Sequence, residues 1–243
     1  MTVSRVLVLQ TGTTLPLLAA RRGDFADWFI RSAALSRHDV EIVRTDRGEA
    51  LPSAARFAAV LVTGSASMVT ERAAWSERTA AWLAASVRSG AVPVLGVCYG
   101  HQLLAHGLGG RVDWNPRGRQ IGTKTLSTAP CAGDDPLFAG IGAGFRAQTT
   151  HQQSVIDPPS CAQVLASSPL DPHQALRFGV RAWGFQFHPE FSAGVMADYI
   201  RGRRERLVSE GLDPSALLRE CGPAPQARRL LQRFVQMARW GGL

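Results

Sequence analysis

The chain has 243 residues, of which 45% are hydrophobic, and its 27 Lys and Arg against 19 Asp and Glu give a formal net charge of +8. This length suits one α/β domain with a sizeable core. A basic surplus can favour nucleic acid. Here the basic residues are nearly all Arg, are scattered along the chain, and form no patch interleaved with aromatic residues. We therefore expect no nucleic-acid partner.

The cysteines indicate a reducing compartment. They are far apart and form no C-x-x-C pair, which argues against a disulfide framework or a zinc site; they are Cys98, Cys131, Cys161 and Cys221. The apolar start of the chain is short and no cleavage site follows it, and no apolar run could span a bilayer. We expect a cytoplasmic protein without membrane contact. The histidines and cysteines show no metal-ligand spacing, and the sequence contains no phosphate-binding glycine loop. We therefore expect no metal and no cofactor.

In the first half of the chain, short apolar runs alternate with segments of helical spacing. In chain order we expect a strand at 3–9, a helix capped by Asp24, strands at 40–43 and 57–62, a helix at 75–88, a strand at 92–97 and a helix at 101–108. Alternating strands and helices imply a parallel sheet that is covered on both faces.

The second half is richer in short strands, as if an antiparallel lobe were attached to the parallel sheet. We expect strands at 120–127, 145–150, 163–166, 175–180 and 182–187, and helices at 193–206 and 227–240. The expected organisation is one domain over 1–200 and a C-terminal helical extension over 201–243. The basic last helix could dock a partner, but we expect it to cap the core with one face in solvent.

The most informative motif lies where the strand at 92–97 meets the next helix. Residues 96–100 read Gly-Val-Cys-Tyr-Gly, the thiol counterpart of a nucleophile elbow. Such a turn forces the nucleophile into a strained backbone conformation, and side chains larger than glycine would collide beside it. Cys98 would lie at a helix N-terminus, which favours the thiolate. The alternative is a buried structural cysteine, which does not explain the two glycines.

A second motif, His188-Pro189-Glu190, supplies a base and a group to orient it. In extended backbone, residues i and i+2 point the same way, so His188 and Glu190 can share one side. The end of a parallel strand is where such folds build their sites. The main rival for the base is His151, which could also line the pocket without acting as base. A turn without chemistry is the alternative for this motif alone.

Together the two motifs resemble the class I glutamine amidotransferase family, whose pattern is G-x-C-x-G-x-Q followed some ninety residues later by H-P-E. The resemblance covers roughly residues 3–199. It implies a three-layer, flavodoxin-like α/β fold and hydrolysis of glutamine through a γ-glutamyl thioester. Residues 23–25 with Trp28-Phe29, and 182–184, are similar to stand-alone members of the amidotransferase-like and γ-glutamyl peptidase branch.

The resemblance also implies roles for individual residues. Cys98 would be the nucleophile, His188 the acid and base, and Glu190 its orienter. The N–H groups of Gly64 and Tyr99 would form the oxyanion hole. Residues that would contact the substrate are Gln102, Ser154 and Val155, although residues 151–154 differ from the commoner family spelling.

Several functions remain open at this point. A glutaminase subunit would pass ammonia to a synthetase partner, whereas a free-standing hydrolase would act on γ-glutamyl small molecules with water as acceptor. A non-enzymatic binding protein with a degenerate site is a third hypothesis, against which the complete set of Cys98, His188 and Glu190 argues. The other class of α/β proteins with a cysteine elbow is a fourth, and the late H-P-E motif and Gln102 fit it less well.

Overall fold

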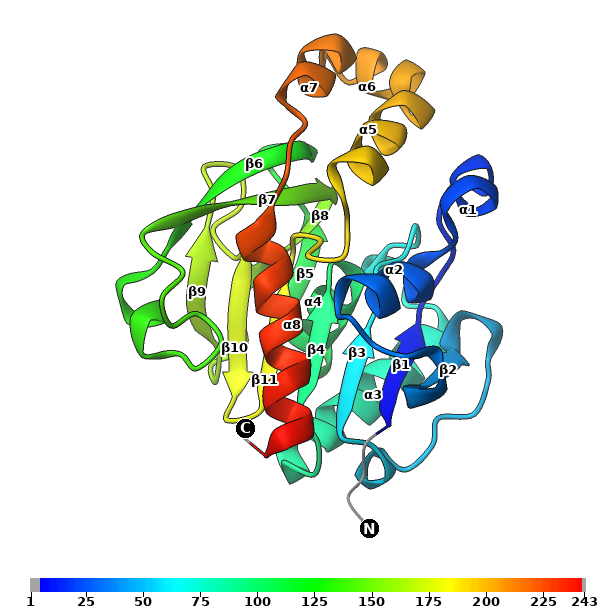
Figure 1. The fold of residues 1–243 in the computed structure, drawn as a ribbon, viewed down its shortest axis with the longest axis vertical. Helices are drawn as coiled ribbons and strands as arrows, with labels where there is room; N and C mark the ends of the chain where they lie inside the picture. Colours follow the sequence, from blue (N-terminus) through cyan, green and yellow to red (C-terminus); the bar gives the residue numbers. More distant parts are fainter. Residues whose placement is uncertain (1–4, 242–243) are drawn as a thin grey trace.

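A nine-stranded mixed sheet forms the centre of the molecule (Figure 1). The structure, a computed structural model, describes residues 5–241, so the first two positions of the strand expected at 3–9 lie outside the described residues. The strand order is β2-β1-β3-β4-β11-β10-β9-β6-β7. The bounds in chain order are β1 Val6–Gln10, β2 Val40–Arg44, β3 Ala59–Val62, β4 Val94–Val97, β6 Gln120–Thr128, β7 Gly144–His151, β9 Gln163–Ser167, β10 Ala175–Gly179 and β11 Ala182–Phe185.

The sheet has a parallel half and an antiparallel half, as the alternation of elements predicted. Strands β2, β1, β3, β4 and β11 pair in parallel. From β11 onward, through β10, β9, β6 and β7, every pairing is antiparallel. A second sheet of two strands, β5 Arg111–Trp114 and β8 Gln153–Asp157, was not predicted from the sequence.

Strand β1 shows why the apolar runs of the first half are continuous. Successive side chains of a strand point to opposite faces, and both faces of a parallel sheet are covered. Val6 and Val8 belong to one hydrophobic cluster, and Leu7 and Leu9 belong to another. All four side chains are fully buried. The sheet therefore forms the middle layer of three.

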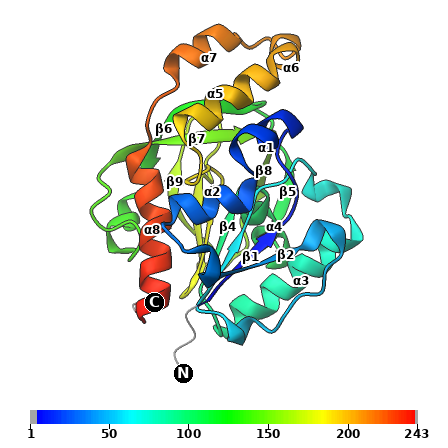
Figure 2. The ribbon, with the colours of Figure 1, turned by 45° about the vertical axis from the view of Figure 1, so that its right-hand side comes forward.

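Helices cover both faces of this sheet. On one face lie α2 Phe25–Ser32 and α8 Pro225–Trp240, and on the other lie α3 Ala74–Ser89 and α4 Tyr99–Gly107. Figures 1 and 2 show α2 and α8 together on the near side of the sheet. Asp24 caps α2 with a reciprocal capping box that involves Asp27, which confirms the helix start predicted at Asp24.

Four short helices form a cap beyond one end of the sheet, at the top of Figure 1. They are α1 Pro16–Arg22, α5 Ala193–Gly202, α6 Arg204–Ser209 and α7 Pro214–Glu220. Their apolar side chains join Phe25, Trp28 and Phe191 in a third hydrophobic cluster. The single helix expected at 193–206 is in fact two, because α5 ends at Gly202, where Leu15 of the neighbouring segment packs closely.

The chain after residue 200 packs back onto the sheet through α8. The boundary expected there falls inside α5, and α8 returns to the sheet. Leu230, Leu231 and Phe234 of α8 are fully buried in the same cluster as Val6 and Val8. The other side of α8 carries exposed residues, as expected of a helix that covers the core with one face in solvent.

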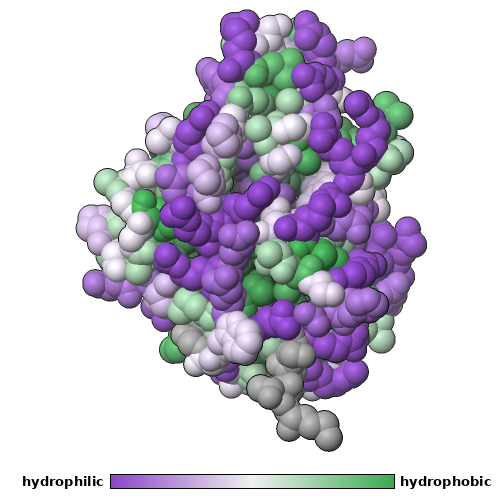
Figure 3. All heavy atoms as spheres, viewed as in Figure 1, coloured by the Kyte–Doolittle hydropathy of each residue, from purple (hydrophilic) through white to green (hydrophobic). Residues whose placement is uncertain are grey.

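The outer surface is mostly hydrophilic on the face shown in Figure 3, with small separate hydrophobic areas. None of the helices within residues 5–241 combines the length and the apolar character that crossing a membrane requires.

The burial of α8 leads to a stability prediction. Phe234 packs edge-on against Trp183 with ring centroids 6.1 Å apart. Phe234→Ala would leave a cavity there and should lower the free energy of unfolding by about 3–5 kcal/mol. Trp240→Ala is the matched control, because Trp240 is 85% exposed at the end of the same helix; its effect should stay within about 0.5 kcal/mol. Denaturant unfolding of both variants measures this, and equal effects would contradict the role of α8 in the core.

Candidate active site

Cys98 occupies a strained turn between β4 and α4. Its backbone has φ 53° and ψ −103°, a left-handed conformation that is rare outside glycine. Its N–H donates to the carbonyl of Phe185 on β11 at 2.7 Å. The two flanking glycines allow the turn: a Cβ on Gly96 would overlap the backbone of Gly100, and a Cβ on Gly100 would lie 2.6 Å from the carbonyl oxygen of Val62. The predicted elbow is therefore present.

His188 and Glu190 follow β11 and face the same way, as the spacing predicted. Nδ1 of His188 lies 2.7 Å from Oε1 of Glu190. Phe191 stacks on the imidazole with ring centroids 4.1 Å apart. The backbone is held as well, because His188 N donates to Gln148 O at 2.8 Å and Ser32 Oγ donates to Glu190 O at 2.9 Å. These contacts fix the orientation of the ring.

The charges around His188 favour its protonated form. Burial lowers the pKa of His188, but the Glu190 carboxylate and the Cys98 sulfur outweigh burial and raise that pKa to about 10. Nε2 of His188 is buried and has no hydrogen-bond partner at ordinary distance among the described residues. A Cβ on Gly64 would lie 3.1 Å from Cε1 of His188 and 3.6 Å from Cβ of Cys98, so Gly64 lies against both side chains.

Cys98 and His188 lie in the wall of a pocket of about 610 Å³. Its other walls come from the segments that follow β1 and β3, from the residues between β7 and β8, and from the cap. The pocket is thus at the carboxyl ends of the parallel strands, where open α/β sheets bind ligands. Residues of the cap form one wall of this pocket.

Three other predicted residues lie close to this centre. Gly64 touches Cys98 and His188, as described above. Tyr99 lines the pocket, and its hydroxyl is turned away to Ser76 at 2.6 Å. Gln102 lines the pocket too, and its amide nitrogen donates to the Gln153 carbonyl at 2.7 Å and to Gln186 Oε1 at 3.0 Å. The amide of Gln102 is therefore held in one orientation.

Ser154 and Val155 are not among the residues that line the pocket. The Ser154 hydroxyl donates to Asp171 Oδ2 at 2.7 Å, and Val155 is buried in the hydrophobic cluster behind α4. Within the segment that was expected to hold the substrate, the residues that line the pocket are 150–153, which precede Ser154 and Val155.

The competing histidines have other partners. His151 lines the pocket, and its Nε2 lies 3.1 Å from Asp171 Oδ2. His101 is fully buried, and burial lowers its pKa to about 3, so it stays neutral. His106 contacts Glu77 at 3.1 Å. His151 and His106 therefore also lie beside carboxylates, but the His188 ring is the one that lies with Cys98 against Gly64.

Sequence reasoning missed the charged residues of the pocket wall. Arg119, Arg203, Arg206 and Glu71 all line it. No local motif marked them, since they come from a loop before β6, the junction of α5 and α6, and a turn after β3. Across residues 5–241, no group of three or more His, Cys, Asp or Glu is arranged to hold a metal ion.

Comparison with known proteins identifies the family. The family model described as "Glutamine amidotransferase class-I" matches residues 23–203. The chain belongs to the class I glutamine amidotransferase family, a family of glutamine-hydrolysing enzymes.

Curated relatives are longer proteins. The "GMP synthase [glutamine-hydrolyzing]" of Aeropyrum pernix is 34% identical over 186 residues, which cover 76% of this chain and 32% of that protein. A protein of the same name from Thermus thermophilus is 41% identical over 103 residues, which cover 42% of this chain and 20% of that protein. The chain therefore spans a third or less of the length of these relatives.

Solved structures share the whole fold. A glutamine amidotransferase from Thermotoga maritima has a TM-score of 0.76 and 21% identity, with 97% of this chain and 98% of that chain covered. A glutamine amidotransferase from Methylobacillus flagellatus has a TM-score of 0.74 and 22% identity, with coverage of 98% and 94%. This likeness extends over the cap and α8, beyond the range of the family model.

The charge arrangement around His188 predicts how it titrates. In Glu190→Gln the carboxylate that raises the pKa of His188 is lost and burial remains, so the ring should lose its proton at a distinctly lower pH than in the wild type. NMR of ¹³C-labelled histidine measures this, with the exposed His38 as internal reference. The raised pKa also means that protonated His188 stabilises the fold below about pH 6.5, and that this contribution is lost as the pH rises through about 10. An unchanged His188 titration in Glu190→Gln would contradict the pairing.

Proposed function

We propose that this protein hydrolyses the side-chain amide of glutamine or a related γ-glutamyl amide, with Cys98, His188 and Glu190 as the catalytic residues. One observation carries the proposal: a cysteine in a nucleophile elbow lies beside a buried His–Glu pair at the wall of one pocket. Each of the three groups has the chemistry that acyl transfer through a thiol requires.

In the first half of the reaction, the Cys98 sulfur attacks the amide carbon as thiolate, and the carbonyl electrons move to oxygen. The N–H groups of Gly64 and Tyr99 are proposed to stabilise that oxyanion; Tyr99 is the first residue of α4, where helical N–H groups have no partner within the helix. The intermediate collapses when the C–N bond breaks. Protonated His188 gives its proton to the leaving amine, and a γ-glutamyl thioester remains on Cys98.

In the second half, water attacks the thioester. His188, now neutral, takes a proton from that water, and the C–S bond breaks to release glutamate and restore the thiolate and the protonated imidazole. Glu190 holds Nδ1 of the ring at 2.7 Å throughout, so that Nε2 is the nitrogen that exchanges protons. The net reaction consumes one water and yields glutamate and an amine.

For glutamine the leaving amine is ammonia, and two fates are compatible with the site. The curated relatives are GMP synthases, in which the matched region is only part of the chain. By analogy, a synthetase partner would receive the ammonia.

The second candidate is a free-standing γ-glutamyl hydrolase, which the capped pocket of about 610 Å³ favours, because such a volume suits ligands much larger than glutamine. Activation of glutamine hydrolysis by a co-purifying synthetase would support the first fate.

The nucleophile can be identified by intact-protein mass spectrometry after treatment with a diazo-ketone analogue of glutamine. Wild type should gain a single adduct, and Cys98→Ala should gain none. Cys161→Ala is the matched control, because Cys161 is a free and exposed cysteine, and it should be labelled like wild type. Glutamine hydrolysis by Cys98→Ala should fall by about 10⁴-fold or more. Retained turnover would remove Cys98 from the mechanism.

Gln102 is proposed to contact the glutamyl part of the substrate, since its amide lines the pocket and is held by Gln153 and Gln186. Gln102→Ala should therefore raise KM more than it lowers the rate of thioester formation. Steady-state kinetics combined with single-turnover acylation separates the two effects. A large loss of acylation rate at saturating substrate, with KM unchanged, would assign Gln102 to the chemical step instead.

A further inference from the structure

Arg203, at the junction of α5 and α6, is a cation of the pocket wall without a carboxylate partner. It lines the pocket, and its guanidinium lies over the Tyr199 ring with the central carbon 4.8 Å from the ring centroid. Its Nη1 is buried and makes no hydrogen bond to any described residue. None of the ion pairs within residues 5–241 includes it. A buried, unpaired donor of this kind is costly unless a ligand satisfies it.

The surrounding wall has an excess of positive charge. Arg119 and Arg206 both line the pocket, and both are bonded to Glu210, with N–O distances of 2.5 and 3.0 Å. One carboxylate therefore serves two guanidinium groups on this wall. Glu71, on the turn after β3, also lines the pocket, but no ion pair among the described residues joins it to Arg203, so three guanidinium groups face one lining carboxylate. Burial lowers the pKa of Arg203, and the nearby Arg119 and Arg206 lower it further. An anion in the pocket would relieve this repulsion.

The position of Arg203 tells which part of a substrate it would meet. His188 must lie beside the leaving nitrogen in order to protonate it. The rings of His188 and Phe191 stack with centroids 4.1 Å apart, and the Phe191 centroid lies 5.1 Å from that of Tyr199. The Cζ atom of Arg203 lies 4.8 Å from the Tyr199 centroid, so these side chains form a continuous row from His188 to Arg203. Gln102, by contrast, lies on α4 and is tied to Gln153. If Gln102 contacts the glutamyl part, as proposed above, the leaving amine would lie on the cap side of His188, where Arg203 also lines the pocket.

We propose that Arg203 binds a carboxylate carried by the amine portion of the substrate, so that the preferred substrates are γ-glutamyl amino acids or peptides with a free carboxylate. This inference rests on the proposed function, since it assigns specificity to the same site. The guanidinium can donate two parallel hydrogen bonds to a carboxylate, an arrangement that the flat ring of Tyr199 beneath it supports.

The test compares kcat/KM for γ-glutamylglycine and γ-glutamylglycinamide, which differ in the terminal carboxylate alone, with glutamine as a third substrate. Wild type should prefer the acidic substrate by about tenfold or more, the usual weight of a charge-assisted hydrogen-bonded pair. Arg203→Met, which keeps an unbranched apolar stem and removes the guanidinium, should reduce that ratio to about one. Arg203→Lys, which keeps the charge without the planar fork, should give an intermediate ratio.

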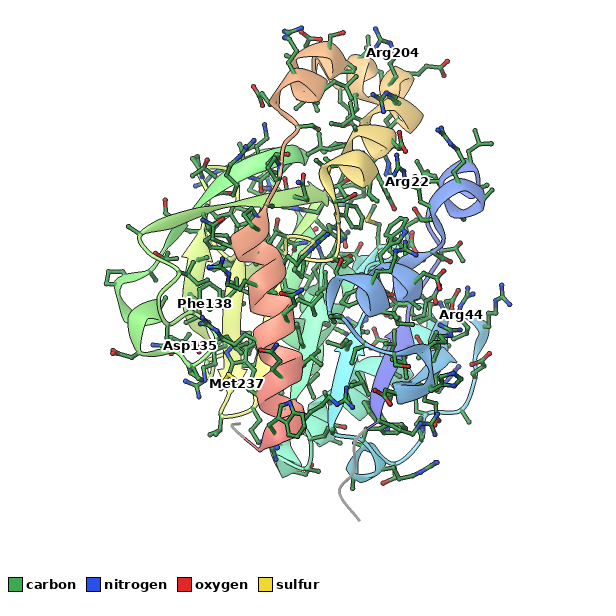
Figure 4. The ribbon with its side chains drawn as sticks, in the orientation of Figure 1. Arg22, Arg44, Asp135, Phe138, Arg204 and Met237 are labelled. Carbon is green, nitrogen blue, oxygen red and sulfur yellow. The ribbon has the colours of Figure 1, made fainter. Side chains whose placement is uncertain are left out.

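Arg204→Met is the matched control. Arg204 is exposed, lies on the outer side of the cap in Figure 4, and is absent from the pocket lining, so this variant should keep the wild-type ratio. Equal kcat/KM values for both glycine substrates in wild type, or an unchanged ratio in Arg203→Met, would overturn the role of Arg203 while leaving the Cys98 chemistry in place. If wild type cleaved none of the three substrates, the proposed function would fail and this inference would fail with it.

Discussion

The backbone conformation of Cys98 is the constraint on which the rest of the site depends. A residue with φ 53° and ψ −103° is unfavourable by itself, and the neighbouring structure has to hold it there. The hydrogen bond from Cys98 N to β11 and the close approach of Gly100 to β3 both help to hold the turn. The same contact with β11 sets the distance between Cys98 and the segment that carries His188. Strand order, the two glycines and the position of His188 are thus parts of one arrangement.

The sequence predicted those features that depend on residues near one another in the chain. The elbow at Cys98, the pairing of His188 with Glu190 and the cap of α2 at Asp24 are local patterns, and the structure contains all three. The strands of the parallel half were predictable because both of their faces are buried. A helix was expected at 193–206, but the assembly of the cap over the pocket was not predicted, since it depends on contacts between segments about 180 residues apart, such as Thr14 with Tyr199 and Arg22 with Asp198. The placement of Ser154 was missed for the same reason, because its partner Asp171 lies on a later loop.

Electrostatics divides the pocket into two regions. Around His188, the carboxylate of Glu190 and the sulfur of Cys98 supply negative charge in a buried setting, and the ring responds by holding its proton. On the wall formed by the cap, guanidinium groups outnumber the carboxylate that serves them. Glu210 shows the effect directly, since the hydrogen bond from Arg119 outweighs burial and lowers the pKa of Glu210 to about 2. The His188–Glu190 pair and the basic wall are joined by Phe191 and Tyr199, whose rings pack between them.

The return of α8 to the sheet has a consequence for how the cap is attached. Helices α5–α7 leave the core after Glu190, whose backbone is bonded to Ser32, and the chain re-enters it at Gly222, whose N–H and C=O groups are bonded to Thr123 and Gln148. This part of the cap is therefore an insertion that is held to the core at both ends. A truncation from the C-terminal side would remove α8, a core helix, before it reached the residues of the pocket. In such an arrangement the sequence and length of the insertion, and with them the pocket wall, can vary, while the two anchors keep His188 and Glu190 in place beside Cys98.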